Sequence, residues 1–300
     1  MVLIGGASIN EYGTGEGGKA GDQTGKEVLV EPWYLHEKGW IVVRAKDDAQ
    51  RKLIAQNMRY ACANDNIGYS FWDHCYTLME LAERVGWDCS KVDEPCETNC
   101  AKLVYVCVRY AGIPCEDFFT GNEVAALKAT GKFDVLTDSI YTTNDRMLAE
   151  GDILVTKTAG HTVVVLEGGE GATPAIVTNC AWANMRKGSN VNTAVVDTLK
   201  NGTRVALLEY AKNGWGRIAY NGKTGYMAPL YLAELARAKV TGDCWLRTKA
   251  GTTKGKKIVV IPEGARPWIT GEKEKVGSVY WYYCIYKGSE GWASGKYVKP

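Results

Sequence analysis

The sequence has no apolar run approaching the ~20 residues that a membrane-spanning helix requires. Its longest apolar runs are strand-sized, such as Thr162 to Leu166, so we expect no insertion into a membrane. The first seven residues, Met1 to Ala7, lack the basic start and the apolar core of a secretory signal peptide. The sequence as printed therefore predicts synthesis in the cytoplasm.

The chain also has few histidines, 3 in 300 residues, and its ten cysteines form no Cys-x-x-Cys pair. A structural zinc site normally shows such a pair, so a site built from Cys89, Cys96, Cys100 and either His74 or His161 is disfavoured. No cofactor or metal is expected. Because a chain of this size can build an apolar core without disulfides, and because a cytoplasmic start favours free thiols, we expect the cysteines to be reduced.

Charge is distributed unequally along the chain. Residues 1–175 carry 16 Lys and Arg against 26 Asp and Glu, whereas residues 176–300 carry 20 against 8. The first part is therefore acidic, with a net charge of −10, and the second is basic, with a net charge of +12. A basic half favours a polyanionic partner. Nucleic acid is the weaker candidate, because this half shows no nucleic-acid-binding motif.

The basic half contains an internal repeat. Val177 to Arg186 is echoed by Val240 to Arg247. Later positions match at a constant offset of 66 residues: Trp215 with Trp281, Tyr220 with Tyr286, Gly222 with Gly288, Gly225 with Gly291, Tyr226 with Trp292, and Tyr231 with Tyr297. Short β-type runs separated by Asn-Gly or Gly turns predict hairpins, so each copy is expected to be a small all-β unit.

Each copy resembles a bacterial SH3-type domain. The resemblance rests on the Met185-Arg186 start, the Leu199 to Val205 turn, and the later Trp, Gly-Tyr and Tyr-Leu positions. It predicts SH3-like barrels over residues 176–235 and 238–300 that bind the bacterial cell wall. Trp215, Tyr226 and Trp292 are the expected wall-binding residues.

The acidic half has helix-like and then strand-like patterns. Apolar residues at three- and four-residue spacing predict helices over residues 49–64 and 71–84, and further helices are expected over 100–110 and 122–130. Ile153 to Thr156 and Thr162 to Leu166 then predict an antiparallel hairpin. This order, helices first and sheet second, indicates an α+β domain over residues 1–172.

Cys100 is the candidate nucleophile. It follows Thr98 and Asn99, which are good helix N-caps, and it precedes a strongly apolar helix. A thiol at a helix start is expected to have a lowered pKa. His161 stands before a β-branched run and could serve as the general base that a nucleophilic cysteine requires.

Cys100 and His161, 61 residues apart, occur in a pattern that resembles the NlpC/P60 superfamily of papain-like wall peptidases, which includes phage endolysins. In that family the nucleophile lies in Asp-Cys-Ser at a helix start, and the base follows Gly-Asp-Ile/Leu. Here Asn99 and Ala101 replace the Asp and the Ser. A more literal Asp88-Cys89-Ser90 is rejected as the nucleophile, because Pro95 soon follows and opposes a buried helix.

Four further residues are candidates for supporting roles. Tyr69, in Ile67-Gly68-Tyr69, resembles the family's tyrosine near the oxyanion, and a packing role is the alternative. A third catalytic residue would orient the imidazole of His161. The candidates for it are Asp22 and Gln23 in the Gly21 to Gly25 turn, and Asn179 at the start of the first repeat.

The resemblance implies an α+β papain-like catalytic domain followed by two all-β barrels. It implies a peptidoglycan hydrolase that cuts an amide of the stem peptide by a Cys-His mechanism, with the γ-D-glutamyl bond as the usual target. An N-acetylmuramoyl-L-alanine amidase and an inactive wall-binding protein are the alternatives. The expected partners are peptidoglycan and its associated anionic polymers, reached after holin-type or lysis-dependent release.

Overall fold

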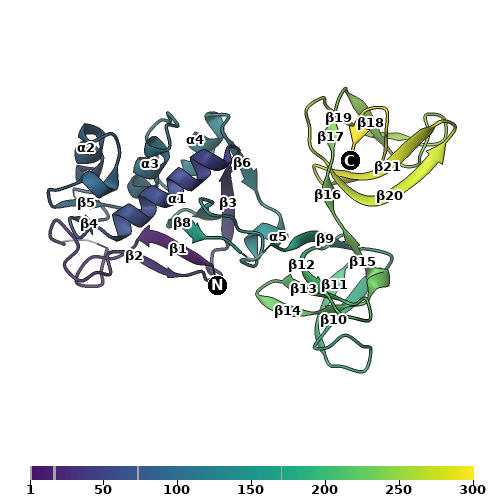
Figure 1. The fold of residues 1–300 in the computed structure, drawn as a ribbon, viewed down its shortest axis with the longest axis horizontal. Helices are drawn as coiled ribbons and strands as arrows, with labels where there is room; N and C mark the ends of the chain where they lie inside the picture. The colour runs from purple at the N-terminus through teal and green to yellow at the C-terminus, as the bar shows by residue number, and fades with distance from the viewer. Residues whose placement is uncertain (1, 16–17, 73, 170) are drawn as a thin grey trace. The chain divides into compact units, whose positions relative to one another are not determined.

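The computed structural model describes residues 2–15, 18–72, 74–169 and 171–300. The chain divides into two compact units, Met1–Gly171 and Ala172–Pro300 (Figure 1). None of the helices in the described ranges combines the length and the apolar character needed to cross a bilayer. All ten cysteines are unpaired.

The first unit is built on a six-stranded sheet with the order β2-β1-β8-β7-β3-β6. Its strands are β1 (Leu3–Ala7), β2 (Val28–Pro32), β3 (Trp40–Ala45), β6 (Phe133–Leu136), β7 (Ile153–Thr156) and β8 (Thr162–Glu167). The expected 153–166 hairpin is confirmed, because β7 and β8 pair antiparallel with Val155 opposite Thr162. The expected order of helices before strands is wrong, since β1, β2 and β3 all precede the first helix.

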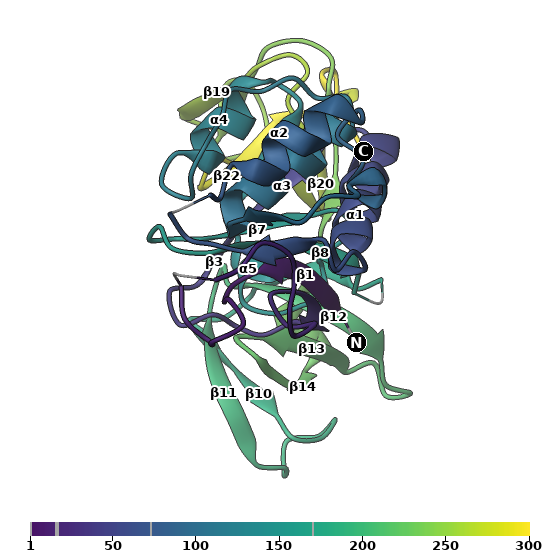
Figure 2. The same ribbon diagram turned by 90° about the vertical axis from the view of Figure 1, so that its left-hand side faces the viewer.

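In the part of the chain that the structure describes, five helices accompany this sheet: α1 (Asp48–Cys62), α2 (Thr77–Arg84), α3 (Cys100–Tyr110), α4 (Glu123–Ala129) and α5 (Ser139–Thr142). α1 and α3 pack on one face of the sheet against β1 and β8, and α5 lies on the other face (Figure 2). Side chains such as Ile54, Val104 and Val164 fill the resulting core. The helices expected over 49–64, 100–110 and 122–130 are confirmed.

The helix expected over 71–84 begins only at Thr77. Asp73 lies outside the described residues, and His74 has a positive φ of 65°, which is incompatible with a continuous helix. The apolar spacing that suggested the longer helix includes Tyr76, which precedes the first helical residue and is exposed. A short parallel ladder of β4 (Ile67–Tyr69) and β5 (Cys96–Thr98) flanks this segment, together with the turn of 3₁₀ helix Cys89–Lys91.

The Gly151-Asp152 dipeptide of the family-like motif has a structural role. Asp152 is fully buried and pairs with Arg44, with Nε–Oδ1 and Nη2–Oδ2 distances of 2.7 and 2.6 Å. It also accepts a hydrogen bond from the Ala149 amide at 2.8 Å. This network joins β3 to the segment that leads into β7, the partner of the strand that follows His161.

Replacing Asp152 by alanine should lower the free energy of unfolding of the first unit by about 3–5 kcal/mol, because it leaves the Arg44 charge unpaired. Urea denaturation followed by circular dichroism measures the change. The matched control is Asp197→Ala, which removes the partly exposed pair with Lys223 and should cost under about 1 kcal/mol. Equal effects of the two substitutions would show that the Arg44 pair does not stabilise this edge of the sheet.

The second unit contains two β modules of the same topology. The first module, residues 173–234, has strands β9 (Thr173–Val177), β10 (Trp182–Arg186), β11 (Val195–Lys200), β12 (Arg204–Tyr210), β13 (Gly216–Tyr220), β14 (Lys223–Met227) and β15 (Leu232–Glu234), and the turn of 3₁₀ helix Pro229–Tyr231. The second module, residues 236–299, has β16 (Ala236–Arg237), β17 (Lys239–Val240), β18 (Cys244–Arg247), β19 (Lys257–Ile261), β20 (Trp268–Val276), β21 (Val279–Tyr286), β22 (Ser289–Ser294) and β23 (Val298–Lys299).

The shared topology confirms the sequence repeat. The strand order β11-β10-β14-β13-β12 in the first module matches β19-β18-β22-β21-β20 in the second. A register irregularity occurs at Arg186 in one module and at Arg247 in the other, and these arginines pair with Tyr226 and Trp292, respectively. The Asn221-Gly222 hairpin is also confirmed, with φ values of 47° and 71°. Each module has its own apolar core.

Candidate active site

Cys100 is the first residue of α3. Asn99 caps the helix, because its side-chain oxygen accepts a hydrogen bond from the Lys102 amide at 2.9 Å. The following residues, Ala101 to Val108, are all buried, so the apolar run fixes the helix in the core. Only 5% of Cys100 is exposed.

The β4–β5 ladder places Tyr69 beside Cys100. Tyr69 pairs with Thr98, two residues before the cysteine, and Gly68 allows this packing because a Cβ there would lie 2.4 Å from the Gly21 carbonyl oxygen. Burial raises the pKa of Tyr69, and the nearby Cys100 and Cys75 thiols raise that pKa further. The structure therefore brings together two of the residues selected from the sequence.

His161 stands immediately before β8. Its backbone N–H donates to Thr156 Oγ1 at 3.1 Å, and its ring centroid lies 6.3 Å from those of Trp40 and His36. Burial lowers the pKa of His161 to about 4, and the neighbouring His36 contributes in the same direction. The imidazole is therefore neutral at neutral pH, which is the form that accepts a proton.

Cys100 lies against the start of the same strand. Burial raises the pKa of the Cys100 thiol to about 12 and Glu123 adds to this, while backbone hydrogen bonds from Thr162 and from the first residues of α3 oppose it. The lowered pKa expected for a thiol at a helix start is therefore outweighed by burial. The Thr162 amide reaches the cysteine, but no hydrogen bond joins the His161 imidazole to Cys100 within the described residues.

Glu123 is a buried acidic residue at this site that the sequence analysis missed. Its Oε1 accepts a hydrogen bond from Thr162 Oγ1 at 2.9 Å, while its Oε2 has no partner in the described structure. Burial raises the pKa of Glu123 to about 8, so the carboxyl is largely neutral at neutral pH. An acidic residue in the first turn of a helix is common, and nothing in the sequence distinguishes this one.

The Gly21 to Gly25 turn has a structural arrangement of its own. Asp22 accepts hydrogen bonds from backbone amides, including Gly25 N at 2.6 Å and Glu27 N at 3.0 Å. Gln23 donates to the Ala20 and Gly21 carbonyls. Within the described residues, neither side chain forms a hydrogen bond with His161. The link from this turn to the site is the buried Glu27, whose Oε2 accepts from the Tyr69 amide at 2.9 Å.

Asn179, the other candidate for the third residue, belongs to the second unit. Its side chain donates to the Leu230 carbonyl at 3.1 Å, which fixes it within the first β module. Cys89 is fully buried in the 3₁₀ turn, and its backbone amide donates to Asn57 Oδ1. The described residues contain no group of three His, Cys, Asp or Glu side chains arranged to hold a metal ion.

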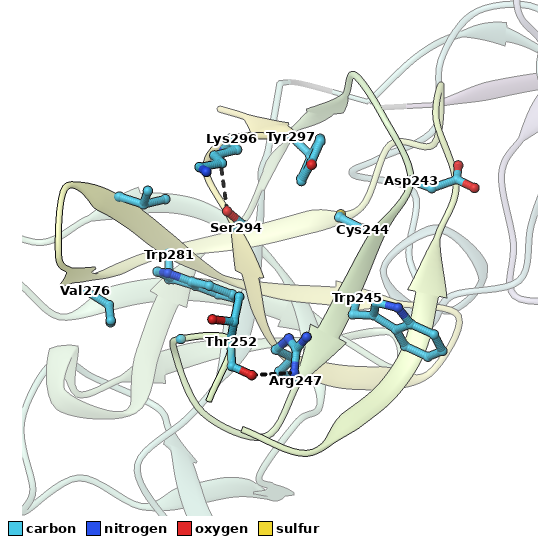
Figure 3. Close-up of a pocket in the computed structure, with 12 residues that line it drawn as sticks. Asp243, Cys244, Trp245, Arg247, Thr252, Val276, Trp281, Ser294, Lys296 and Tyr297 are labelled. Atoms are coloured by element: carbon cyan, nitrogen blue, oxygen red, sulfur yellow. Dashed lines mark hydrogen bonds between the residues drawn. The ribbon is translucent and has the colours of Figure 1, made fainter. Parts of the chain in front are cut away.

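A pocket of about 410 Å³ lies in the second β module (Figure 3). Trp245, Trp281 and Tyr297 supply its aromatic lining, and Arg247 and Lys296 supply two cationic side chains. Trp281 occupies the position in the second module that Trp215 occupies in the first. Both Trp215 and Tyr226 are half-buried in the first module. Trp292 does not line this pocket, and its ring packs against Tyr283 with centroids 5.5 Å apart.

Comparison with known families gives two matches along the chain. Residues 4–172 match the model of the endolysin-like domain. Residues 181–233 match the bacterial SH3 domain. The first match covers more than half of the chain and contains Cys100, His161, Tyr69 and Glu123.

Comparison with individual proteins gives shorter matches. A protein of Listeria welshimeri described as probable endopeptidase p60 is 40% identical to this chain over 57 residues. A protein of Listeria monocytogenes with the same description is 37% identical over 59 residues. Each match covers 19% of this chain. These segments cover only 11% and 12% of those proteins, respectively. Among solved structures, NlpC2 from Trichomonas vaginalis aligns at 14% identity with a TM-score of 0.22, covering 44% of this chain and 49% of that one. A putative autolysin from Listeria monocytogenes aligns at 15% identity with a TM-score of 0.19, covering 43% of this chain and 62% of that one.

Proposed function

Because this chain belongs to the endolysin-like domain family, we propose that it is a peptidoglycan hydrolase with Cys100 as nucleophile and His161 as general base. The observation that carries the proposal is the meeting of two distant segments. The Cys100 thiol lies at the start of α3 and against the Thr162 amide, the residue directly after His161. A papain-like site requires this juxtaposition of a helix start and a strand start.

In the proposed reaction, the Cys100 sulfur attacks an amide carbonyl of the stem peptide while the His161 imidazole takes the thiol proton. The C–N bond then breaks as His161 returns the proton to the leaving amine, and an acyl-enzyme remains. A water molecule, deprotonated by His161, attacks the acyl carbon and releases the acid and the thiol. The hydrogen bond between base and nucleophile is often long in a free enzyme and tightens with substrate.

The pKa values support a neutral resting pair. The Cys100 pKa of about 12 and the His161 pKa of about 4 keep both groups uncharged at neutral pH. Proton transfer then accompanies attack on the substrate, and no preformed thiolate–imidazolium pair is needed. The Tyr69 hydroxyl is the proposed donor to the developing oxyanion.

Two amide bonds are candidates for cleavage. The NlpC/P60 resemblance implies the γ-D-glutamyl bond. The amide between N-acetylmuramic acid and L-alanine is the second candidate. It is favoured by an aromatic pocket of the first unit, which is lined by Phe71, Trp72, Tyr76 and Phe119. Mass spectrometry of muropeptides released from purified walls identifies the bond directly, because each cleavage leaves a different new amino terminus.

The inactive wall-binding protein is the rival function, because Asn99 and Ala101 depart from the NlpC/P60 pattern. A zymogram with Gram-positive wall substrates separates the two. Clearing by the intact chain supports the hydrolase, whereas wall binding without clearing on every substrate tested would support the rival. Action on the wall from outside the producing cell would follow holin-type or lysis-dependent release, in keeping with the proposed synthesis in the cytoplasm.

The second unit is the proposed wall anchor. Residues 172–300 expressed alone should sediment with Gram-positive walls, whereas residues 1–171 should not, because their net charges have opposite sign. The boundary must precede β9, since Thr173–Val177 pairs with β12 and β15 in the first module. Failure of the isolated second unit to bind any wall preparation at low salt would contradict the anchoring role.

The salt dependence of that binding separates two modes of attachment. Attraction between exposed charges should weaken steeply as the Debye length falls from ~10 Å at 0.1 M salt to ~3 Å at 1 M. Binding that resists salt but is lost in Trp281→Ala would instead indicate the aromatic pocket of the second module.

A further inference from the structure

Four aromatic side chains are exposed beside the proposed nucleophile: Phe71, Trp72, Tyr76 and Phe119. Trp72 is 68% exposed and Phe119 is 61% exposed. Together they rim a pocket of about 220 Å³ whose floor includes Asn99 and Lys102, from the first turn of α3. Large exposed apolar side chains gathered around a pocket mark a binding surface.

This pocket adjoins the catalytic site on two sides. Asn99 directly precedes Cys100, and its Nδ2 donates to the Phe71 carbonyl at 3.2 Å. Thr120, next to Phe119, accepts a hydrogen bond at its Oγ1 from the Gly160 amide at 3.1 Å, one residue before His161. A group held in the pocket would therefore lie beside Asn99 and Phe119, which connect the pocket to the two segments that carry the proposed catalytic residues.

The charged side chains that line the pocket neutralise each other. Lys102 Nζ forms an ion pair with Asp117, donates to the Phe118 carbonyl at 2.9 Å, and lies 4.6 Å from the centroid of the Tyr76 ring. Asn99 is also engaged, through its helix cap and its bond to Phe71. Among the described residues that line it, the pocket thus offers aromatic faces and no unpaired charge, so it suits a neutral ligand with an apolar face.

We propose that this aromatic pocket binds a neutral N-acetylated sugar ring of the glycan strand, a proposal that rests on the proposed wall substrate. Stem peptides carry charged groups and small methyl side chains, and neither type fills an uncharged aromatic pocket. The sugar rings are the large groups of the polymer with apolar C–H faces that can pack on aromatic rings. A sugar bound here makes the amide between glycan and peptide the bond nearest Cys100.

The test uses the full chain carrying Cys100→Ala, which prevents turnover. Two probes are titrated by calorimetry: N-acetylmuramoyl-L-alanyl-D-isoglutamine and the same dipeptide without the sugar. We expect the sugar-bearing probe to bind at least about tenfold more tightly, which corresponds to about 1.4 kcal/mol. Adding Trp72→Ala or Phe119→Ala should abolish that difference.

Trp182→Ala is the matched control, because Trp182 is 61% exposed and lies in the first β module. It should leave the affinity for both probes unchanged. Circular dichroism verifies that each variant is folded, which is expected for substitutions of such exposed residues. Three results would overturn the proposal. The two probes could bind with equal affinity, neither could bind at millimolar concentration, or the preference for the sugar could survive both substitutions.

Wall lysis by the chain with Cys100 intact separates this proposal from the proposed function. Trp72→Ala should raise KM for walls more than it lowers kcat, because it removes binding and leaves the reacting groups in place. Lysis without any preference for the sugar-bearing probe would sink only the sugar site. Aromatic-dependent sugar binding without lysis of any wall would sink only the hydrolase.

Discussion

Replacing Cys100 by alanine should reduce the rate of wall lysis by at least about a thousandfold, because loss of a nucleophile removes the covalent route. The substitution removes one sulfur atom from a site that is only 5% exposed. The Asn99 cap and the buried face of α3 do not depend on the thiol. Turbidity loss of Gram-positive walls measures lysis, and sedimentation with the same walls shows whether binding is retained.

Cys89→Ala is the control, because Cys89 is the competing cysteine in the sequence. Cys89 is fully buried in the core, and burial raises the pKa of its thiol well above the ordinary value. Its substitution should therefore cost stability and leave most of the activity. Cys100→Ser should be nearly as inactive as Cys100→Ala, because a serine hydroxyl is a much weaker nucleophile at this pH. Full activity in Cys100→Ala together with inactivity in a folded Cys89→Ala would reverse the assignment.

The sequence alone located α3 because two local signals agree there and the packing follows them. Asn99 is a good cap, the apolar run that follows is continuous, and the helix packs against the sheet as that run predicts. The repeat in the second unit was equally readable, since each module repeats the same hairpin turns and the same strand order. Local chemistry and tertiary packing coincide in these segments.

The strands β1, β2 and β3 were not predicted, and for β1 the composition explains why. β1 contains Gly5 and Gly6, which are poor strand formers, and Gly5 is required by packing because a Cβ there would lie 2.7 Å from Met58 Cγ. The helix expected from Phe71 failed for a different reason. Its apolar spacing included Tyr76, which is exposed at the proposed sugar pocket.

The electrostatics of the site were also beyond the sequence. A helix start favours a thiolate, but whether burial outweighs the helix dipole depends on the side chains that enclose the sulfur. Glu123 and Thr162 come from elements distant in sequence from Cys100, and only the fold brings them to it. The same holds for His161, whose pKa is set by burial and by His36.

Replacing His161 by alanine should lower the rate of lysis by about 10²–10⁴-fold, the usual contribution of a general base. In the unsubstituted chain the base is active when neutral, so activity should rise with pH through about 4. That acid limb lies below the ordinary histidine pKa of 6.5, because burial disfavours the imidazolium. His161→Ala should abolish the limb as well as most of the rate.

His36→Asn provides the sharper control, because it keeps the base and removes the neighbour whose charge lowers the pKa of His161. Its rate at neutral pH should be close to that of the unsubstituted chain, and its acid limb should move to higher pH. The pH dependence of kcat/KM on soluble wall fragments measures both effects, with circular dichroism at each pH to identify acid unfolding. An acid limb near pH 6.5 in the unsubstituted chain would contradict a buried, neutral imidazole. A folded His161→Ala variant that retained more than about a tenth of the rate would exclude His161 as the base.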